Sequence, residues 1–105
     1  MDTQYTDFRI NDLMATLCVG KDKAISRKQL SQSMDMSDRA MRELIEKARG
    51  EGCMILNAQD GRGYYLPSST EDILKQYKQD THRALSILKR RKHMRNYLKE
   101  AGIQI

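Results

Sequence analysis

The side chains best suited to chemistry in this chain are charged or hydrogen-bonding groups that recur at helical spacing between residues 37 and 46. The strongest candidates are Ser37, Asp38, Arg39, Arg42 and Glu43, with Glu46 a weaker one. An arginine can donate two hydrogen bonds to guanine O6 and N7, and a carboxylate can accept one from cytosine N4. This set suits a helix that reads base pairs in a DNA major groove, with Arg39 and Arg42 as the base readers.

The same spacing has a simpler interpretation. Arg39–Glu43 and Arg42–Glu46 are pairs four residues apart, and such pairs also form on solvated helices that bind nothing. The predicted neighbouring elements distinguish the two interpretations, and in this chain they favour DNA contact.

Residues 37–51 are predicted to form the helix that presents these side chains. Its apolar positions share one narrow face: Met41, Leu44, Ile45 and Ala48. Ser37 is a good N-cap, and Gly50 and Gly52 end the helix. The result is a short helix anchored by one face, with its charged face turned outward.

A second capped helix precedes it. In the run Ser26-Arg27-Lys28-Gln29, serine and glutamine stand three residues apart and form a capping box. This helix ends near residue 34, and residues 34–36 make a tight turn into the next one, which predicts a helix-turn-helix. Ser26, Arg27 and Lys28 would then lie against a DNA phosphate, helped by backbone N–H groups at the helix start.

A β-hairpin is predicted after the second of these helices. Residues 53–56 form one strand, residues 64–66 form the other, and two glycines allow the turn between them. Arg62 at the tip could enter the minor groove or grip a phosphate, with Gln59 beside it. Upstream, residues 7–18 fit an amphipathic helix, and Ala24-Ile25 could pair at a sheet edge.

The order of these elements is helix, short strand, helix, helix, strand, strand. It predicts a mainly α fold with a small β-hairpin, a winged helix-turn-helix, over residues 1–67. Residues 26–67 also resemble the N-terminal winged-helix domain of the bacterial biotin repressor, through S-R-K-Q-L, M-S-D-R-A-M and G-R-G-Y-Y-L-P. The resemblance implies this fold and a DNA-facing third helix. It implies no biotin chemistry, because no ligase-type G-R-G-R-x-G loop or catalytic lysine follows the hairpin.

Residues 68–105 are predicted to form a basic helical extension, either one long helix or a helix pair. Ser68 and Glu71 are spaced as another capping box, and no glycine or proline follows until Gly102. One apolar stripe comprises Ile73, Leu74, Tyr77, Thr81, Ala84, Leu85 and Leu88. A second stripe, turned around the helix, comprises Ile87, Met94, Tyr97, Leu98 and Ala101. The basic residues Lys89, Arg90, Arg91 and Lys92 lie where the stripes change over.

The changeover leaves two alternatives: the helix breaks near residues 89–93, or its halves pack against different partners. We expect the first stripe to form a homodimer interface, which would place two recognition helices over two half-sites. The extension could instead fold back on the first helix of its own domain or bind a partner protein. The basic run is either a second phosphate contact or solvated exterior.

The charge distribution separates the two regions. Residues 1–70 hold ten basic and ten acidic side chains, whereas residues 71–105 hold nine basic and four acidic ones. Phosphate neutralisation supplies most of the non-specific affinity for DNA. The helix-turn-helix should therefore supply specificity more than affinity.

Other classes of function find little support. Cys18 and Cys53 have no CxxC spacing, and His82 and His93 have no metal-spaced partners, so we expect no metal site and no cofactor. No serine or cysteine has a histidine and carboxylate set, so we expect no enzyme. No apolar run could span a membrane, and the N-terminus lacks signal-peptide features, which predicts a soluble, cytoplasmic protein.

The sequence thus predicts sequence-specific binding of double-stranded DNA by a homodimeric transcriptional regulator of bacterial, phage or mobile-element origin. One alternative is a phage or mobile-element accessory protein for DNA replication or recombination, whose C-terminal helix docks to a protein partner. A second alternative is a winged-helix scaffold for protein interactions that makes no DNA contact.

Overall fold

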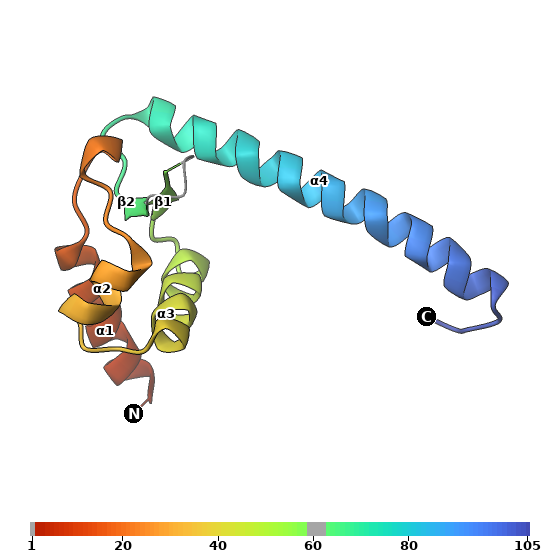
Figure 1. Cartoon of the computed structure of the whole chain (residues 1–105), viewed down its shortest axis with the longest axis horizontal. Helices are drawn as coiled ribbons and strands as arrows, with labels where there is room; N and C mark the ends of the chain where they lie inside the picture. Colours follow the sequence, from red (N-terminus) through yellow and green to blue (C-terminus); the bar gives the residue numbers. More distant parts are fainter. Residues whose placement is uncertain (1, 59–62) are drawn as a thin grey trace. The chain divides into compact units, whose positions relative to one another are not determined.

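The computed structural model describes residues 2–58 and 63–105, with side chains described from Phe8 onward. The elements are α1 (Asp2–Thr16), the 3-10 turn η1 (Lys21–Lys23), α2 (Arg27–Ser33), α3 (Asp38–Gly50), β1 (Leu56–Asn57), β2 (Tyr64–Tyr65) and α4 (Thr70–Glu100). As predicted, the chain is mainly helical, with a small antiparallel hairpin and a long C-terminal helix (Figure 1). It contains two compact units, Met1–Ile73 and Leu74–Ile105.

Helix α1 starts earlier and ends earlier than the predicted residues 7–18. No glycine or proline interrupts residues 2–16, so the helix extends to Asp2. It stops at Thr16 because the following backbone pairs with the end of the hairpin. The Leu66 N–H donates to the Cys18 carbonyl (2.8 Å), and the Gly20 N–H donates to the Leu66 carbonyl (2.9 Å). Groups used in that pairing cannot also continue the helical ladder.

Helices α2 and α3 begin at the predicted caps. The Gln29 N–H donates to Ser26 Oγ (3.1 Å), and the Ser26 N–H donates back to Gln29 Oε1 (3.2 Å), which completes the capping box. The Ala40 N–H donates to Ser37 Oγ (3.1 Å) at the start of α3. Asp35 takes the left-handed conformation (φ 52°) that the tight turn requires. The two helices and the tight turn between them therefore lie where the sequence predicted them.

The hairpin is shorter than predicted. Leu56 pairs with Tyr65 and Asn57 pairs with Tyr64, whereas residues 53–55 form no ladder. The prediction of a strand at residues 53–55 was wrong because the backbone there turns back on α3. The Cys53 N–H donates to the Ala48 carbonyl (3.0 Å), and the Ile55 N–H donates to the Cys53 carbonyl (3.0 Å). Ile55 is nonetheless buried, so the apolar run serves the core rather than the sheet.

A third segment pairs with the hairpin at Tyr64, next to Gly63. Ile25 and Tyr64 exchange two backbone hydrogen bonds (2.8 and 2.9 Å), so the edge pairing expected for Ala24-Ile25 is confirmed. Gly63 has φ 132°, and a Cβ there would overlap the Ile25 carbonyl. Only glycine lets the two backbones approach this closely without strain.

Arg49, in the last turn of α3, connects that helix to both strands. Its Nε donates to the Ile55 carbonyl (2.9 Å), and its terminal nitrogen donates to Asn57 Oδ1. Its guanidinium lies 5.6 Å from the centroid of the Tyr64 ring, which is within cation–π range. The orientation of the hairpin is therefore tied to the end of α3.

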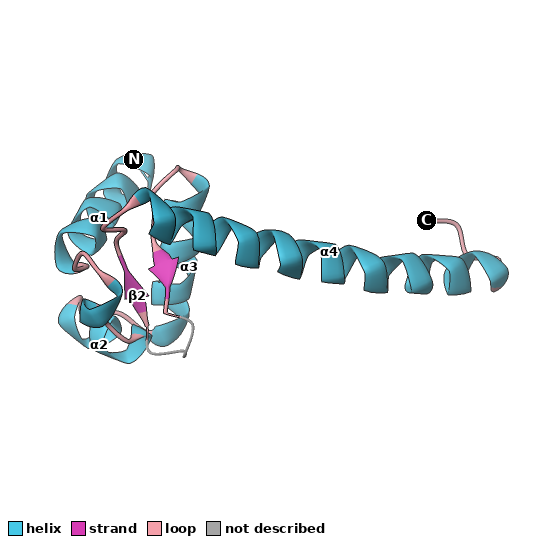
Figure 2. Ribbon diagram, turned by 90° about the horizontal axis from the view of Figure 1, so that it is seen from above, coloured by secondary structure: helices cyan, strands magenta, loops and turns pink. Residues whose placement is uncertain are grey.

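The core of the first unit lies among α1, α2 and α3, beside the hairpin (Figure 2). Its three fully buried large side chains come one from each helix: Leu13, Leu30 and Met41. The apolar face predicted for α3 is buried in this cluster as a whole. A smaller cluster of Leu56, Ala58 and Tyr65 lies on the hairpin, and burial there raises the pKa of the Tyr65 hydroxyl.

Helix α4 runs without a break from Thr70 to Glu100, so the alternative of a helix pair broken near residues 89–93 is wrong. The helix begins at Thr70, which is later than a capping box of Ser68 and Glu71 would place its start. Asp72, rather than Glu71, accepts from the Ser68 N–H (3.0 Å), and the Asp72 N–H donates to Ser69 Oγ (3.4 Å). The boundary between the units falls inside this helix, after Ile73, whereas the predicted boundary follows residue 67.

Among the described residues, α4 included, no helix combines the length and the apolar content of a membrane span.

Replacing Gly63 by alanine should destabilise the first unit by about 2–3 kcal/mol, because the new Cβ meets the Ile25 backbone at a positive φ. Gly50→Ala is the matched control: it lies in a helix with no atom near the added Cβ, and should be neutral or stabilising by up to about 1 kcal/mol. Urea unfolding measures both changes. Equal stability of the two variants would contradict the backbone approach at Gly63.

Candidate nucleic-acid interface

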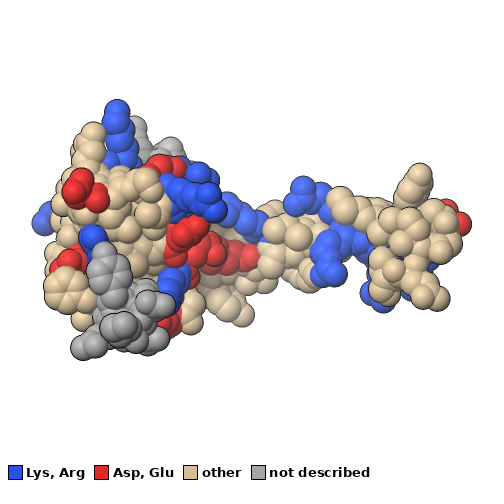
Figure 3. Space-filling view, turned by 90° about the horizontal axis from the view of Figure 1, so that it is seen from below, with Lys and Arg blue, Asp and Glu red and all other residues tan. Residues whose placement is uncertain are grey.

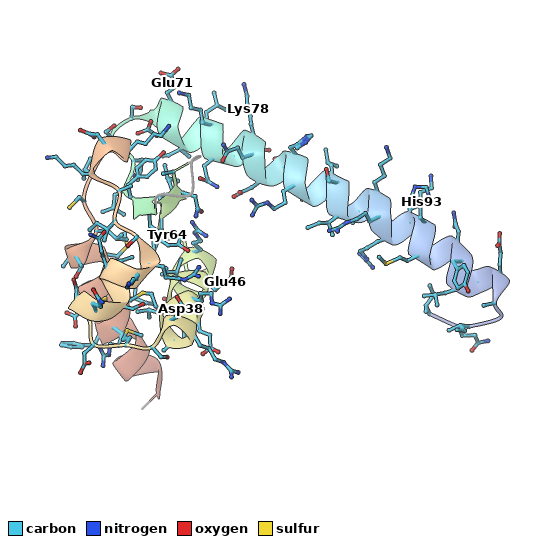
Figure 4. The ribbon with its side chains drawn as sticks, viewed as in Figure 1. Asp38, Glu46, Tyr64, Glu71, Lys78 and His93 are labelled. Carbon is cyan, nitrogen blue, oxygen red and sulfur yellow. The ribbon has the colours of Figure 1, made fainter. Side chains whose placement is uncertain are left out.

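The exposed face of α3 carries the predicted base readers. Its opposite face is buried in the core, so the remaining side chains must face outward. The exposed fraction is 88% for the Arg39 side chain, 60% for Arg42 and 70% for Glu43. Asp38 and Glu46 extend from the same helix (Figure 4). The structure brings these predicted residues onto one accessible helix face.

Asp38 connects two arginines on different helices. Arg27 Nε, in the first turn of α2, donates to Asp38 Oδ1 (2.6 Å), and Arg42 Nε lies 3.3 Å from Asp38 Oδ2. The hydrogen bond from Arg27, with the charges of Arg27 and Arg42, holds the pKa of the Asp38 carboxyl below its usual value. The same hydrogen bond raises the pKa of the Arg27 guanidinium. Both groups are therefore charged throughout the neutral range.

The Arg27–Asp38 contact was not found from the sequence, although both residues were candidates. They are eleven positions apart on two helices, and no spacing rule for a single helix relates them. The turn between α2 and α3 brings the two helix starts together. A paired cation and anion at the first turns of successive helices is the signal that could have suggested it.

The other ion pairs of α3 agree only in part with the predicted ones. Arg39 Nε lies 3.3 Å from Glu43 Oε1, as four-residue spacing predicts. Arg42 pairs with Asp38 instead of Glu46, so the expected Arg42–Glu46 pair is not the one formed. Helical side chains lean toward the N-terminus of their helix, which favours the partner four residues earlier.

The residues at the start of α2 that were predicted to contact phosphate differ from one another in their contacts within the fold. The Ser26 hydroxyl accepts the N–H of the capping box, and Ser37 does the same for α3, so both serines have structural roles. Lys28 is exposed beside them. Gln59 and Arg62, predicted at the hairpin tip, lie outside the described residues.

A polar hollow lies between the start of α2 and the hairpin, lined by Arg27, Asn57, Gly63 and Tyr64. The Tyr64 hydroxyl contributes, after Asp38, to the raised pKa of the Arg27 guanidinium. Figure 4 shows Tyr64 extending from the hairpin. The sequence placed Tyr64 in a strand and gave Asn57 no role, because the contacts of Tyr64 with Ile25 and of Asn57 with Arg49 are tertiary contacts.

The basic run on α4 is exposed at every position: Lys89, Arg90, Arg91 and Lys92. Consecutive helical residues are turned by about 100°, so these four side chains point in different directions and cannot all contact one surface. The unit Leu74–Ile105 holds nine Lys or Arg and two Asp or Glu residues. Basic side chains accordingly predominate over acidic ones along the helix in Figure 3.

The predicted dimer stripe is exposed along α4 apart from its first member. Leu74, Tyr77, Leu85 and Leu88 are 49–67% exposed, and Thr81 and Ala84 are exposed as well. Ile73 is partly buried and belongs to the first unit. A single helix cannot bury these side chains against itself, so the stripe from Leu74 to Leu88 is an apolar surface within its unit.

Within the described part of the chain, no three His, Cys, Asp or Glu side chains are grouped closely enough to hold a metal ion. Both cysteines are unpaired thiols. No family model, curated protein or solved structure matches the chain.

Replacing Asp38 by asparagine should lower stability above pH 5 and make less difference as the pH falls toward 2. The lowered pKa of Asp38 means that the unfolded chain takes up the proton first, near pH 4. The stabilisation is complete above that pH and is lost as the pH falls through the lower folded value.

Urea unfolding at several pH values measures the effect. Glu46→Gln is the control, since Glu46 lies on the same exposed helix but outside the Arg27–Asp38–Arg42 network. A stability loss in Asp38→Asn that is the same at every pH would contradict the ion pair.

Proposed function

We propose that this chain is a winged-helix protein that binds double-stranded DNA sequence-specifically and regulates transcription as a homodimer. The observation that carries the proposal is the geometry of α3. This capped helix buries one face in the core and exposes Arg39 and Arg42 on the other, directly after a tight turn from α2.

The order of elements supports a winged helix. Helix α1 is followed by the paired residue Ile25, then by α2, α3 and the β1–β2 hairpin. Ile25 pairs with Tyr64, so a third backbone segment lies along the hairpin beside the start of α2. In such a fold the second helix of the helix-turn-helix enters the major groove and the hairpin serves as the wing.

The charged residues suggest which side chains would contact bases and which would contact phosphates. Arg39 and Arg42 would contact base edges, while Lys28 and Arg27 would contact phosphate. Asp38 would hold Arg42 in one orientation before DNA arrives, so that less side-chain entropy is lost on binding. Gln59 and Arg62 would contact the backbone or the minor groove from the wing.

The net charge of the first unit predicts a low affinity for DNA. Residues 1–73 hold ten Lys or Arg and twelve Asp or Glu residues, so the unit has a small negative net charge. One copy should therefore bind DNA weakly. A dimer through α4 would combine two such units, and the linkage would raise the apparent affinity without any new contact.

The DNA contacts are tested by selecting bound duplexes from a random pool and titrating the selected site. Arg39→Ala and Arg42→Ala should each lose about 1–3 kcal/mol of discrimination at one base pair. Lys28→Ala should weaken all duplexes alike and reduce the salt slope by about one. Lys47→Ala, exposed in the last turn of α3, should retain the wild-type preference. Equal losses on all sequences from every variant would remove the base-reading roles.

The dimer is tested by light scattering over a range of concentrations. Leu85→Glu introduces a charge into the apolar stripe and should shift the protein toward monomer. Ser86→Glu adds the same charge away from the stripe and should leave the mass unchanged. A monomeric wild-type chain at micromolar concentration would contradict the homodimer.

A second candidate is an accessory protein for DNA replication or recombination, which uses the same DNA-binding unit and docks a protein through α4. The unbroken length of α4 favours it, because the second apolar stripe is turned away from the first on the same helix. Binding selected by DNA structure rather than by a palindromic sequence would favour this candidate over a regulator.

A further inference from the structure

The C-terminal part of α4 forms a groove with the residues that follow it. At the helix end, Gly102 has φ 79°, its N–H donates to the Lys99 carbonyl (3.0 Å), and the Ile103 N–H donates to the Leu98 carbonyl (2.9 Å). These bonds reverse the chain, so that Ile105 lies beside the helix. The groove is lined by Leu88, Met94, Leu98 and Ile105 together with Arg91, Lys92 and Arg95.

The groove combines an apolar floor with a positive rim. Met94 and Ile105 are 60% and 66% exposed, whereas Leu98 is partly buried. From residue 89 to 105 the chain holds six Lys or Arg residues and one Glu, so a single side-chain carboxylate of this segment is available to balance the rim. A partner must cover apolar area and neutralise cations at the same time.

We propose that this groove docks an acidic amphipathic helix of a partner protein. Such a helix would place its apolar stripe on Met94, Leu98 and Ile105, and its flanking carboxylates on Arg91 and Arg95. The proposal does not depend on DNA binding by the first unit, because every residue involved belongs to the unit Leu74–Ile105.

Two other occupants fit the groove less well. A second copy of this helix segment would bring like charges together at the rim, since the segment has a strongly positive net charge. The preceding segment, residues 74–88, holds three Lys or Arg and one Asp, and is better suited to self-association. A DNA phosphate would neutralise the rim but leave the apolar floor exposed to water.

The probe is a fluorescein-labelled synthetic helix of about 18 residues, with leucines at i, i+3, i+4 and i+7 and glutamates elsewhere. Fluorescence anisotropy with the full chain should give a dissociation constant on the order of micromolar. A peptide of the same composition with scrambled leucines should bind at least about tenfold more weakly. Scrambled peptide binding as tightly, or no binding of either peptide, would overturn the proposal.

Charge-reversal variants separate the rim from net charge. Arg91→Glu with Arg95→Glu should weaken binding by at least about tenfold, whereas Lys89→Glu with Arg90→Glu changes the net charge equally outside the groove and should weaken it little. Equal losses in the two double variants would show attraction by net charge alone and overturn the proposal.

Apolar variants and a competitor complete the test. Leu98→Ser should weaken binding, and Tyr97→Ser, a 72% exposed neighbour that does not line the groove, should not. Circular dichroism of each variant checks that α4 remains helical. An unlabelled DNA duplex that displaces the probe as well as unlabelled peptide does would assign the groove to DNA and overturn the proposal.

Discussion

The shared burial of Leu13, Leu30 and Met41 is the constraint on which the first unit depends. Each comes from a different helix, and none is accessible to water. Each of these helices is short and would be marginal alone in water, so the common core stabilises all three. Burying one face of α3 there also determines which face carries Arg39, Arg42 and Glu43 outward.

The hairpin depends on a second, backbone constraint. Gly63 lets the return strand approach Ile25 closely enough for Tyr64 to exchange two hydrogen bonds with it. Arg49 ties the same hairpin to the end of α3 through Ile55 and Asn57. The hairpin, the start of α2 and α3 are therefore held in a defined relation, although the hairpin has only two residues in each strand. A two-stranded hairpin of this size would not be stable by itself.

The two units differ in how their charges are balanced. In the first unit, cations and anions alternate and pair, as the Arg27–Asp38–Arg42 network shows. Pairing orders the side chains but reduces the net attraction of the surface for a polyanion. In the second unit, basic residues predominate and the apolar side chains of one long helix are exposed. The first arrangement suits selective contact, and the second suits association with other molecules.

The sequence by itself determined the local features. The caps at Ser26 and Ser37 and the apolar face of α3 follow from residue types at short spacing. Short-range backbone geometry decides them, so they could be predicted. Edge pairing of Ala24-Ile25 was predicted as well, but its partner Tyr64 lies far along the chain and was not. Gln59 and Arg62 stay predictions.

Only the tertiary structure decided the remainder. The early end of α1, the missing strand at residues 53–55, and the contacts Arg27–Asp38 and Arg49–Asn57 all join groups from different elements. The continuity of α4 is also visible only in the structure, because the changing stripes fit either a break or two partners. Periodicity reports which face of an element is apolar, but the partner of a polar group depends on how the elements pack.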